Sequence, residues 1–306
     1  MARRPRRCLI ALLILVLASA CAPTVVEAEP PMSLASTTST TTFVITTTSL
    51  PVVTTTTTPE ATTSSGPAMT TTTFSEVDAD VAVPSGTGPF PAVVLVHGGG
   101  WVSGTPDLLR PLADLLNENG YLTVNTRYAL ASFEHSAFPE AVDEVACAVR
   151  LAATHPDSDG TVAVIGHSAG AHIGALVALV GEQYGAGCAH DGTGVPDRFI
   201  GLAGPYDVSR LGIAVVPFFG SGPNQAPEVW DAGNPQLLTD ENTELNSLII
   251  YGEEDALVDE TFAFDFHEAL VSSGSESLVQ VVEGARHNDV HDPDLIGDLI
   301  VTWLER

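Results

Sequence analysis

Short apolar runs alternate with stretches of helical periodicity over the last three quarters of the chain. The runs are bounded by Gly, Pro or polar residues, which predicts buried β-strands. Between them, apolar residues recur three and four positions apart, as in helices that cover a core. The expected strands are 93–96, 121–124, 161–165, 199–202, 247–251 and 278–282. The expected helices are 106–119, 139–154, 171–180, 261–272 and 293–304.

This order of elements predicts an α/β fold. Strands that are apolar at every position are typical of a mostly parallel sheet with helices on both faces. Residues 76–83 alternate instead, which indicates an antiparallel edge strand. Residues 210–243 are rich in Pro and Gly and show little periodicity, so we expect a long loop or a small cap there. Its aromatic residues, Phe218, Phe219 and Trp230, either line a pocket or pack the segment down.

The N-terminal quarter has the pattern of an export signal. Arginines precede an apolar core over 9–17 and a short run of small residues that ends at Cys21. Two readings stay open: Cys21 becomes the lipidated first residue of a bacterial lipoprotein, or ordinary signal peptidase cuts after Ala20. We therefore expect an exported protein, secreted or held at the cell surface, with a lipid on Cys21 as its sole membrane attachment.

A Thr-, Ser- and Pro-rich segment follows the signal. It is nearly uncharged and has few apolar residues, so it cannot bury enough surface to offset its ordering entropy. The sequence thus predicts a signal over 1–21, a disordered stalk over 22–75 and one folded domain over 76–306.

Charge and cysteine content narrow the function. Without the four arginines of the signal, the chain has seven basic and 38 acidic residues, which gives a formal charge near −31. Phosphate contacts need basic side chains, so nucleic-acid binding is disfavoured. In an exported domain Cys147 and Cys188 predict a disulfide worth about 4 kcal/mol, the alternative being two buried free thiols. The spacing of His and Cys predicts neither a metal site nor a cofactor.

The pentapeptide Gly-His-Ser-Ala-Gly at 166–170 joins an expected strand to an expected helix. A strand, a sharp turn with a serine at its apex and a helix form a nucleophile elbow, which lifts the hydroxyl of Ser168 out of the sheet. Upstream, another apolar strand runs into His-Gly-Gly-Gly-Trp at 97–101. Such a glycine run leaves backbone N–H groups free to stabilise a developing oxyanion.

A serine nucleophile needs a base, and the base needs an orienting acid. Each would follow a late strand of the sheet, in the chain order Ser, acid, His. Asp255 follows the strand at 247–251 and is the preferred acid; Glu254 and Asp259 are alternatives. His287 follows the last strand and is the preferred base, with His291 as its rival.

Together these motifs resemble the α/β-hydrolase superfamily, in the esterase/lipase branch with an HGGGW oxyanion loop. That branch includes proteins like hormone-sensitive lipase, feruloyl esterase and kynurenine formamidase, and the likeness covers residues 76–306. It implies that Ser168 is the nucleophile, His287 the general base and acid, and Asp255 its orienting partner. It also implies oxyanion donors at the backbone N–H groups of Gly99, Gly100 and Ala169.

The resemblance implies a serine carboxylesterase that needs no cofactor and acts on small-molecule esters through an acyl-enzyme. The brief cap and acidic surface predict short acyl chains on neutral or cationic substrates. A formamidase-type amide hydrolase with the same triad is one alternative. A non-catalytic surface binding module on a hydrolase fold is another.

Overall fold

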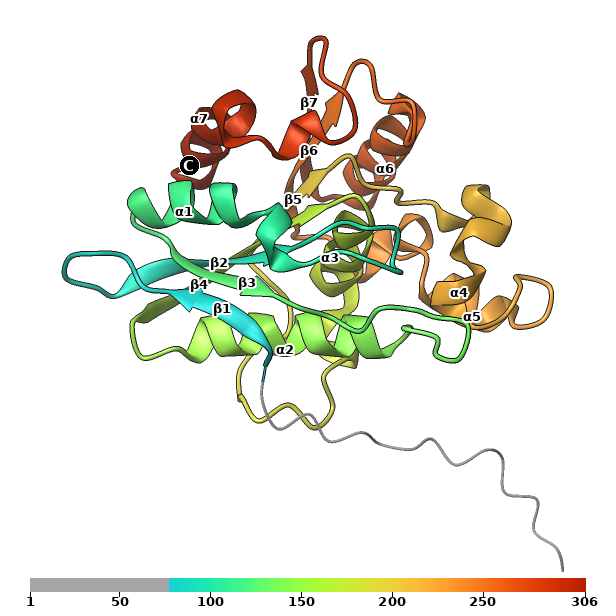
Figure 1. The fold of residues 1–306 in the computed structure, drawn as a ribbon, viewed down its shortest axis with the longest axis horizontal. Coiled ribbons are helices and arrows are strands. Elements are labelled where there is room, and N and C mark those ends of the chain that lie inside the picture. Colours follow the sequence, from blue (N-terminus) through green and yellow to red (C-terminus); the bar gives the residue numbers. More distant parts are fainter. Residues whose placement is uncertain (1–76) are drawn as a thin grey trace, which may run out of the picture. The chain divides into compact units, whose positions relative to one another are not determined.

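The computed structural model describes residues 77–306. The predicted signal, with Cys21, and the predicted stalk lie outside the described residues. One seven-stranded sheet with helices on both faces forms the described part (Figure 1), which confirms the predicted α/β class. The strands are β1 (Ala79–Ala82), β2 (Phe90–Val96), β3 (Leu122–Thr126), β4 (Ser158–His167), β5 (Arg198–Leu202), β6 (Asn246–Gly252) and β7 (Glu276–Val282).

The sheet is parallel except at one edge. Its strand order is β1-β3-β2-β4-β5-β6-β7, and β1 alone runs antiparallel, beside β3. Because the other strands share one direction, the loops that leave β2, β3, β4, β5, β6 and β7 all start at the same, carboxyl edge. In open α/β sheets this edge is where ligands bind.

Two helical layers cover the sheet. α1 and α7 pack over one face, and α2, α3 and α6 cover the other. Strand β2 shows why its residues are apolar throughout: Val93 and Leu95 enter one core, whereas Val94 and Val96 enter the other. The main helices are α1 (Arg110–Glu118), α2 (Glu140–Thr154), α3 (Ala169–Val180), α6 (Glu260–Ser273) and α7 (Pro293–Leu304).

The helix predicted over 106–119 divides in two. A 3₁₀ turn, η1 (Pro106–Leu108), precedes α1, which starts at Arg110 with Pro111 in its first turn. Proline has no N–H to donate within a helix, so it starts a new helix here instead of continuing the first. The prediction of one continuous helix was wrong at this point.

The cap predicted over 210–243 is built from short helices. Its aromatic residues pack together: the ring centroids of Phe218 and Phe219 lie 5.1 Å apart, and those of Phe219 and Trp230 lie 4.6 Å apart. All three side chains are buried, so they hold the cap down. The short elements are η3 (Val208–Val215), α4 (Val216–Phe219), α5 (Pro227–Ala232), η4 (Pro235–Leu237) and η5 (Thr239–Glu241); η2 (Gly181–Gln183) and η6 (Asp289–His291) lie outside the cap.

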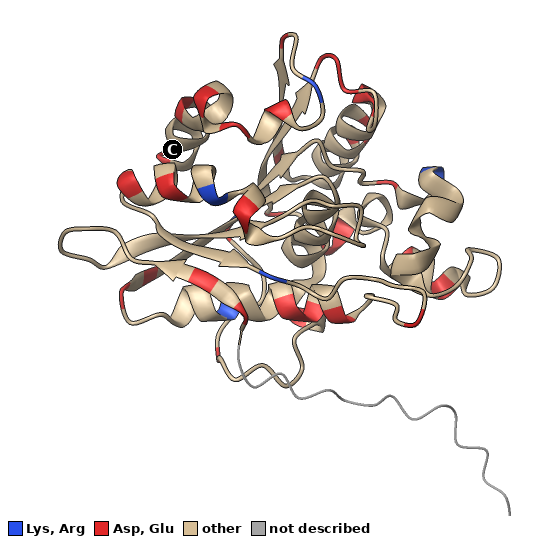
Figure 2. Cartoon of the chain, viewed as in Figure 1, with Lys and Arg blue, Asp and Glu red and all other residues tan. Residues whose placement is uncertain are grey.

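A disulfide joins Cys147 of α2 to Cys188 in the loop before β5, with Cα atoms 5.5 Å apart. Acidic residues are spread over the helices and loops of the domain, and basic residues are few (Figure 2). Among residues 77–306, no helix combines the length and the apolar character needed to cross a bilayer.

Candidate active site

Ser168 occupies the sharp turn between β4 and α3. Its φ of 53° and ψ of −119° lie outside the ordinary regions for an L-residue. The turn is closely packed: a Cβ on Gly166 would lie 2.3 Å from the carbonyl oxygen of Gly170, and a Cβ on Gly170 would lie 2.1 Å from that of Val96. Side chains at either glycine would clash with backbone, which explains the Gly-x-Ser-x-Gly spacing.

A chain of two hydrogen bonds links three of the predicted site residues. The Oγ of Ser168 lies 2.9 Å from Nε2 of His287, and Nδ1 of His287 lies 2.7 Å from Oδ2 of Asp255. Because Nδ1 faces a carboxylate, it carries the proton, and Nε2 is left to accept the Ser168 hydroxyl. The structure thus brings together side chains that follow β4, β6 and β7.

Asp255 is held as a carboxylate. Its side chain is only 1% exposed, and burial favours the neutral form. Hydrogen bonds from His287 and from the backbone N–H groups of Val258 and Leu257 outweigh burial, so the pKa of Asp255 is lowered. An ionised Asp255 fixes the orientation of the His287 ring.

The alternative acids lie elsewhere. Glu254 is exposed. Asp259 caps the N terminus of α6 through the backbone N–H of Thr261 and pairs with Arg210 at 3.4 Å. The structure therefore places neither carboxylate at the His287 ring.

The rival base, His291, lies at the end of η6. Its ring centroid is 4.9 Å from that of His167, while the ring that meets the Ser168 hydroxyl belongs to His287.

The glycine-rich loop after β2 reaches Ser168. A Cβ on Gly98 would lie 3.2 Å from Cβ of Ser168, so the loop backbone is close beside the elbow. Gly99 and Gly100 have positive φ values of 132° and 61°. Glycine adopts such values easily because it has no Cβ. Ala169 is the first residue of α3, and its N–H has no partner within the helix.

Side chains that the sequence analysis did not select hold the glycine-rich loop in place. The Tyr128 hydroxyl donates to the carbonyl oxygen of His97 at 2.8 Å, and the two rings stack at 4.4 Å. Burial raises the pKa of Tyr128, so the hydroxyl stays a donor. A tyrosine just after a buried strand is a common pattern, and the sequence holds no further sign of this contact.

A second support connects the loop to α3 and the cap. Nε1 of Trp101 donates to Nδ1 of His172 at 3.1 Å, and Nε2 of His172 donates to the carbonyl of Gly233 at 2.8 Å. Burial lowers the pKa of His172 to about 4, so the ring is neutral and both nitrogens are satisfied. His172 is therefore a packing residue that joins the glycine-rich loop to the cap.

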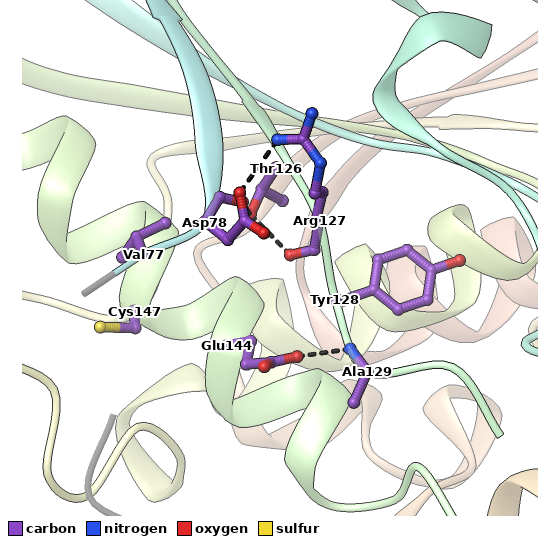
Figure 3. A pocket seen from close by; sticks show the side chains of 8 residues that line it. All are labelled: Val77, Asp78, Thr126, Arg127, Tyr128, Ala129, Glu144 and Cys147. Carbon is purple, nitrogen blue, oxygen red and sulfur yellow. Dashed lines mark hydrogen bonds and ion pairs between the residues drawn. The ribbon is translucent and has the colours of Figure 1, made fainter. Parts of the chain in front are cut away.

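Two cavities lie near the segments that leave β2 and β3. The larger, of about 720 Å³, lies among the loops after β2 and β3 and the cap. The smaller, of about 200 Å³, lies beside β3 and α2 (Figure 3). There Glu144 accepts a hydrogen bond from the backbone N–H of Ala129, and burial raises the pKa of Glu144 to about 7. Within residues 77–306, no cluster of three or more His, Cys, Asp or Glu side chains could hold a metal ion.

The model of the BD-FAE family, an α/β-hydrolase esterase family, matches residues 79–270, more than half of the chain. The chain belongs to this family. No curated protein sequence matches this BD-FAE protein.

Solved structures share the fold of this BD-FAE protein. A bifunctional GH43-CE protein of Bacteroides eggerthii is 19% identical with a TM-score of 0.64 over 74% of this chain and 33% of its own. This chain thus spans about a third of that protein. Esterase 2 of Thermogutta terrifontis is 20% identical, with a TM-score of 0.58 over 74% of this chain and 94% of its own. An acetyl ester-xyloside bifunctional hydrolase of Caldicellulosiruptor lactoaceticus is 16% identical, with a TM-score of 0.63 over 74% of this chain and 87% of its own.

Proposed function

We propose that this BD-FAE protein is a serine carboxylesterase that hydrolyses short-acyl carboxylic esters through an acyl-enzyme. The observation that carries the proposal is the hydrogen-bonded chain from Ser168 through His287 to Asp255 at the carboxyl edge of the sheet. Membership of an esterase family supports ester hydrolysis, and the solved structures described above include esterases by name.

In the first half of the reaction, Oγ of Ser168 attacks the ester carbonyl carbon while its proton passes to Nε2 of His287. The ionised Asp255 stabilises the resulting imidazolium. The oxyanion is held by backbone N–H groups of Ala169, Gly99 and Gly100. His287 then gives its proton to the leaving alcohol oxygen, the carbon–oxygen bond breaks, and the acyl group stays on Ser168.

In the second half, a water molecule replaces the alcohol. His287 takes a proton from the water, whose oxygen attacks the acyl carbon. The tetrahedral intermediate collapses, the carboxylic acid leaves, and the same proton returns to Oγ of Ser168. Each residue ends in its starting state, so the cycle needs no cofactor.

The Ser168→Ala variant tests this assignment. We expect kcat on p-nitrophenyl butyrate to fall roughly 10⁵- to 10⁶-fold while the thermal unfolding transition is kept. A fluorophosphonate probe should label the wild-type protein at Ser168 and leave the variant unlabelled. A variant with wild-type turnover would show that another group carries the reaction.

The choice between ester and amide is tested separately. We expect aryl esters to be hydrolysed faster than N-formylkynurenine; the reverse order would point to a formamidase. Failure of the wild-type protein to react with the fluorophosphonate would instead favour a binding module.

We also propose that the protein is exported and that a lipid on Cys21 anchors it. The arginine-first signal pattern supports export, and the Cys147–Cys188 disulfide agrees with an oxidising compartment. Metabolic labelling with a radioactive fatty acid should mark the wild-type protein and not Cys21→Ala. Absence of label on both would leave ordinary signal cleavage as the explanation, and equal labelling of both would place the lipid on a residue other than Cys21.

A further inference from the structure

The larger cavity lies at the same edge of the sheet as Ser168. Its walls are three segments that leave the carboxyl ends of β2, β3 and β5. A hydrogen bond from the N–H of Phe138 to the carbonyl of Phe218 connects the β3 segment to the cap at 2.9 Å. The lining residues used below are Val102, Phe133, His135, Val216, Pro217 and Gly220.

One wall of the cavity continues directly from the glycine-rich loop. The N–H of Val102 donates to the carbonyl of Gly99 at 3.3 Å, and Gly98 of the same loop stands against Ser168. The N–H of Ala131 donates to the carbonyl of Trp101 at 2.8 Å, so the β3 segment is tied to this loop as well. Val102 therefore joins the cavity wall to the loop that would hold the oxyanion, and the glycines of that loop are not themselves lining residues.

The lining selects an uncharged, apolar occupant. Val102 is 52% exposed and the Phe133 side chain is fully exposed, although both are hydrophobic. The imidazole of His135 is paired with Glu140 at 2.9 Å, and the exposed Glu134 adds negative charge at the rim. A carboxylate-bearing group would be repelled, whereas an apolar group would take Val102 and Phe133 out of water.

The order of the strands decides which half of an ester enters. In the proposed reaction the leaving alcohol oxygen must lie at Nε2 of His287, because that nitrogen protonates it. His287 follows β7, on one side of β4 in the sheet. The Val102 and Phe133 walls follow β2 and β3, on the other side of β4. The Val102 and Phe133 walls thus lie away from the leaving group, whereas Val216, Pro217 and Gly220 of the third wall follow β5, on the same side of β4 as His287.

We propose that this cavity is the acyl pocket of the enzyme and takes an uncharged, apolar acyl group larger than acetyl. Val102 and Phe133 determine its specificity. A volume of about 720 Å³ lies within the range of pockets that bind small molecules, so short acyl chains fit in full. The inference rests on the proposed esterase function, and it adds where the acyl group binds and what chemistry selects it.

Two variants test the pocket: Val102→Trp, which fills it, and Phe133→Ala, which removes an apolar wall. Their matched controls are Val271→Trp and Phe264→Ala on α6, at positions that are 50% and 39% exposed. One substrate series varies the acyl group on p-nitrophenol (acetate, butyrate, octanoate), and the other varies the alcohol on acetate. Thermal melts and fluorophosphonate labelling accompany each variant.

We expect the ratio of kcat/KM for octanoate to that for acetate to fall about tenfold in Val102→Trp, and several-fold in Phe133→Ala. The controls should keep the wild-type ratio. An unchanged ratio in both pocket variants would overturn the pocket, and changes confined to the alcohol series would make it an alcohol site. These results differ from a failure of the esterase assignment, in which wild-type Ser168 would not be labelled at all.

Discussion

The imidazole of His167 donates its Nε2 proton to the backbone carbonyl oxygen of His287 over 3.0 Å. His167 directly precedes Ser168, so this bond ties the strand that carries the candidate nucleophile to the loop that carries the candidate base. Burial lowers the pKa of His167 to about 3, which keeps its ring neutral. The two ring centroids lie 5.2 Å apart.

We expect His167→Leu to lower kcat between tenfold and about a hundredfold, because a released His287 loop no longer sets the Ser168–His287 distance. KM should change little. His167→Gln keeps an N–H donor and should recover part of the loss. The control is His155→Leu, which removes an imidazole from the loop before β4, at the opposite edge of the sheet. Wild-type turnover in His167→Leu would refute this positioning role.

Asp255→Asn should lower kcat about 10⁴-fold without unfolding the protein, because the amide no longer favours the required His287 tautomer. Steady-state kinetics on p-nitrophenyl butyrate measures the effect. Glu254→Gln is the matched control, since that exposed side chain is its neighbour in the chain and should change kcat little. If kcat fell further in Asp259→Asn than in Asp255→Asn, Asp259 would be the acid that orients His287.

Stability should fall as the pH drops from about 6.5 towards 4. Burial lowers the pKa of His172 from 6.5 to about 4. Between these pH values, His172 is protonated in the unfolded chain and neutral in the folded protein. Stability therefore rises with pH, by up to about 1.4 kcal/mol per pH unit for this one group. Urea unfolding at several pH values measures the slope. It should be shallower in His172→Gln, and an equal slope would contradict the assignment.

The disulfide should stabilise the domain by about 4 kcal/mol, because it closes a long loop in the unfolded chain. The two cysteines are 41 residues apart. We expect the free energy of unfolding of the Cys147→Ala/Cys188→Ala double variant, measured by urea unfolding, to be lower by this amount. The wild-type protein under reducing conditions should match it. If oxidised and reduced wild-type protein unfold together, the bond contributes nothing measurable.

Local patterns were enough to predict most of the sheet and its helices. The central strands contain short apolar runs, and each main helix repeats its apolar residues at the helical period, so the signal lies within a few neighbouring residues. The antiparallel edge strand, β1, was predicted from the alternation of apolar and polar residues and is confirmed. The exceptions are equally local in cause: Pro111 divides the helix predicted over 106–119, and the cap lacks any clear period.

Strand and turn patterns also select Ser168, because the strand, the glycines and the helix that form the elbow are adjacent in the chain. They leave the choice between His287 and His291, and between Asp255 and Asp259, open, since each pair differs by only four positions. Which imidazole meets Ser168, 119 residues away, depends on the path of the loop after β7. Hydrophobic periodicity acts over a few residues and sets the elements, whereas a hydrogen bond between distant side chains is settled only once those elements have packed.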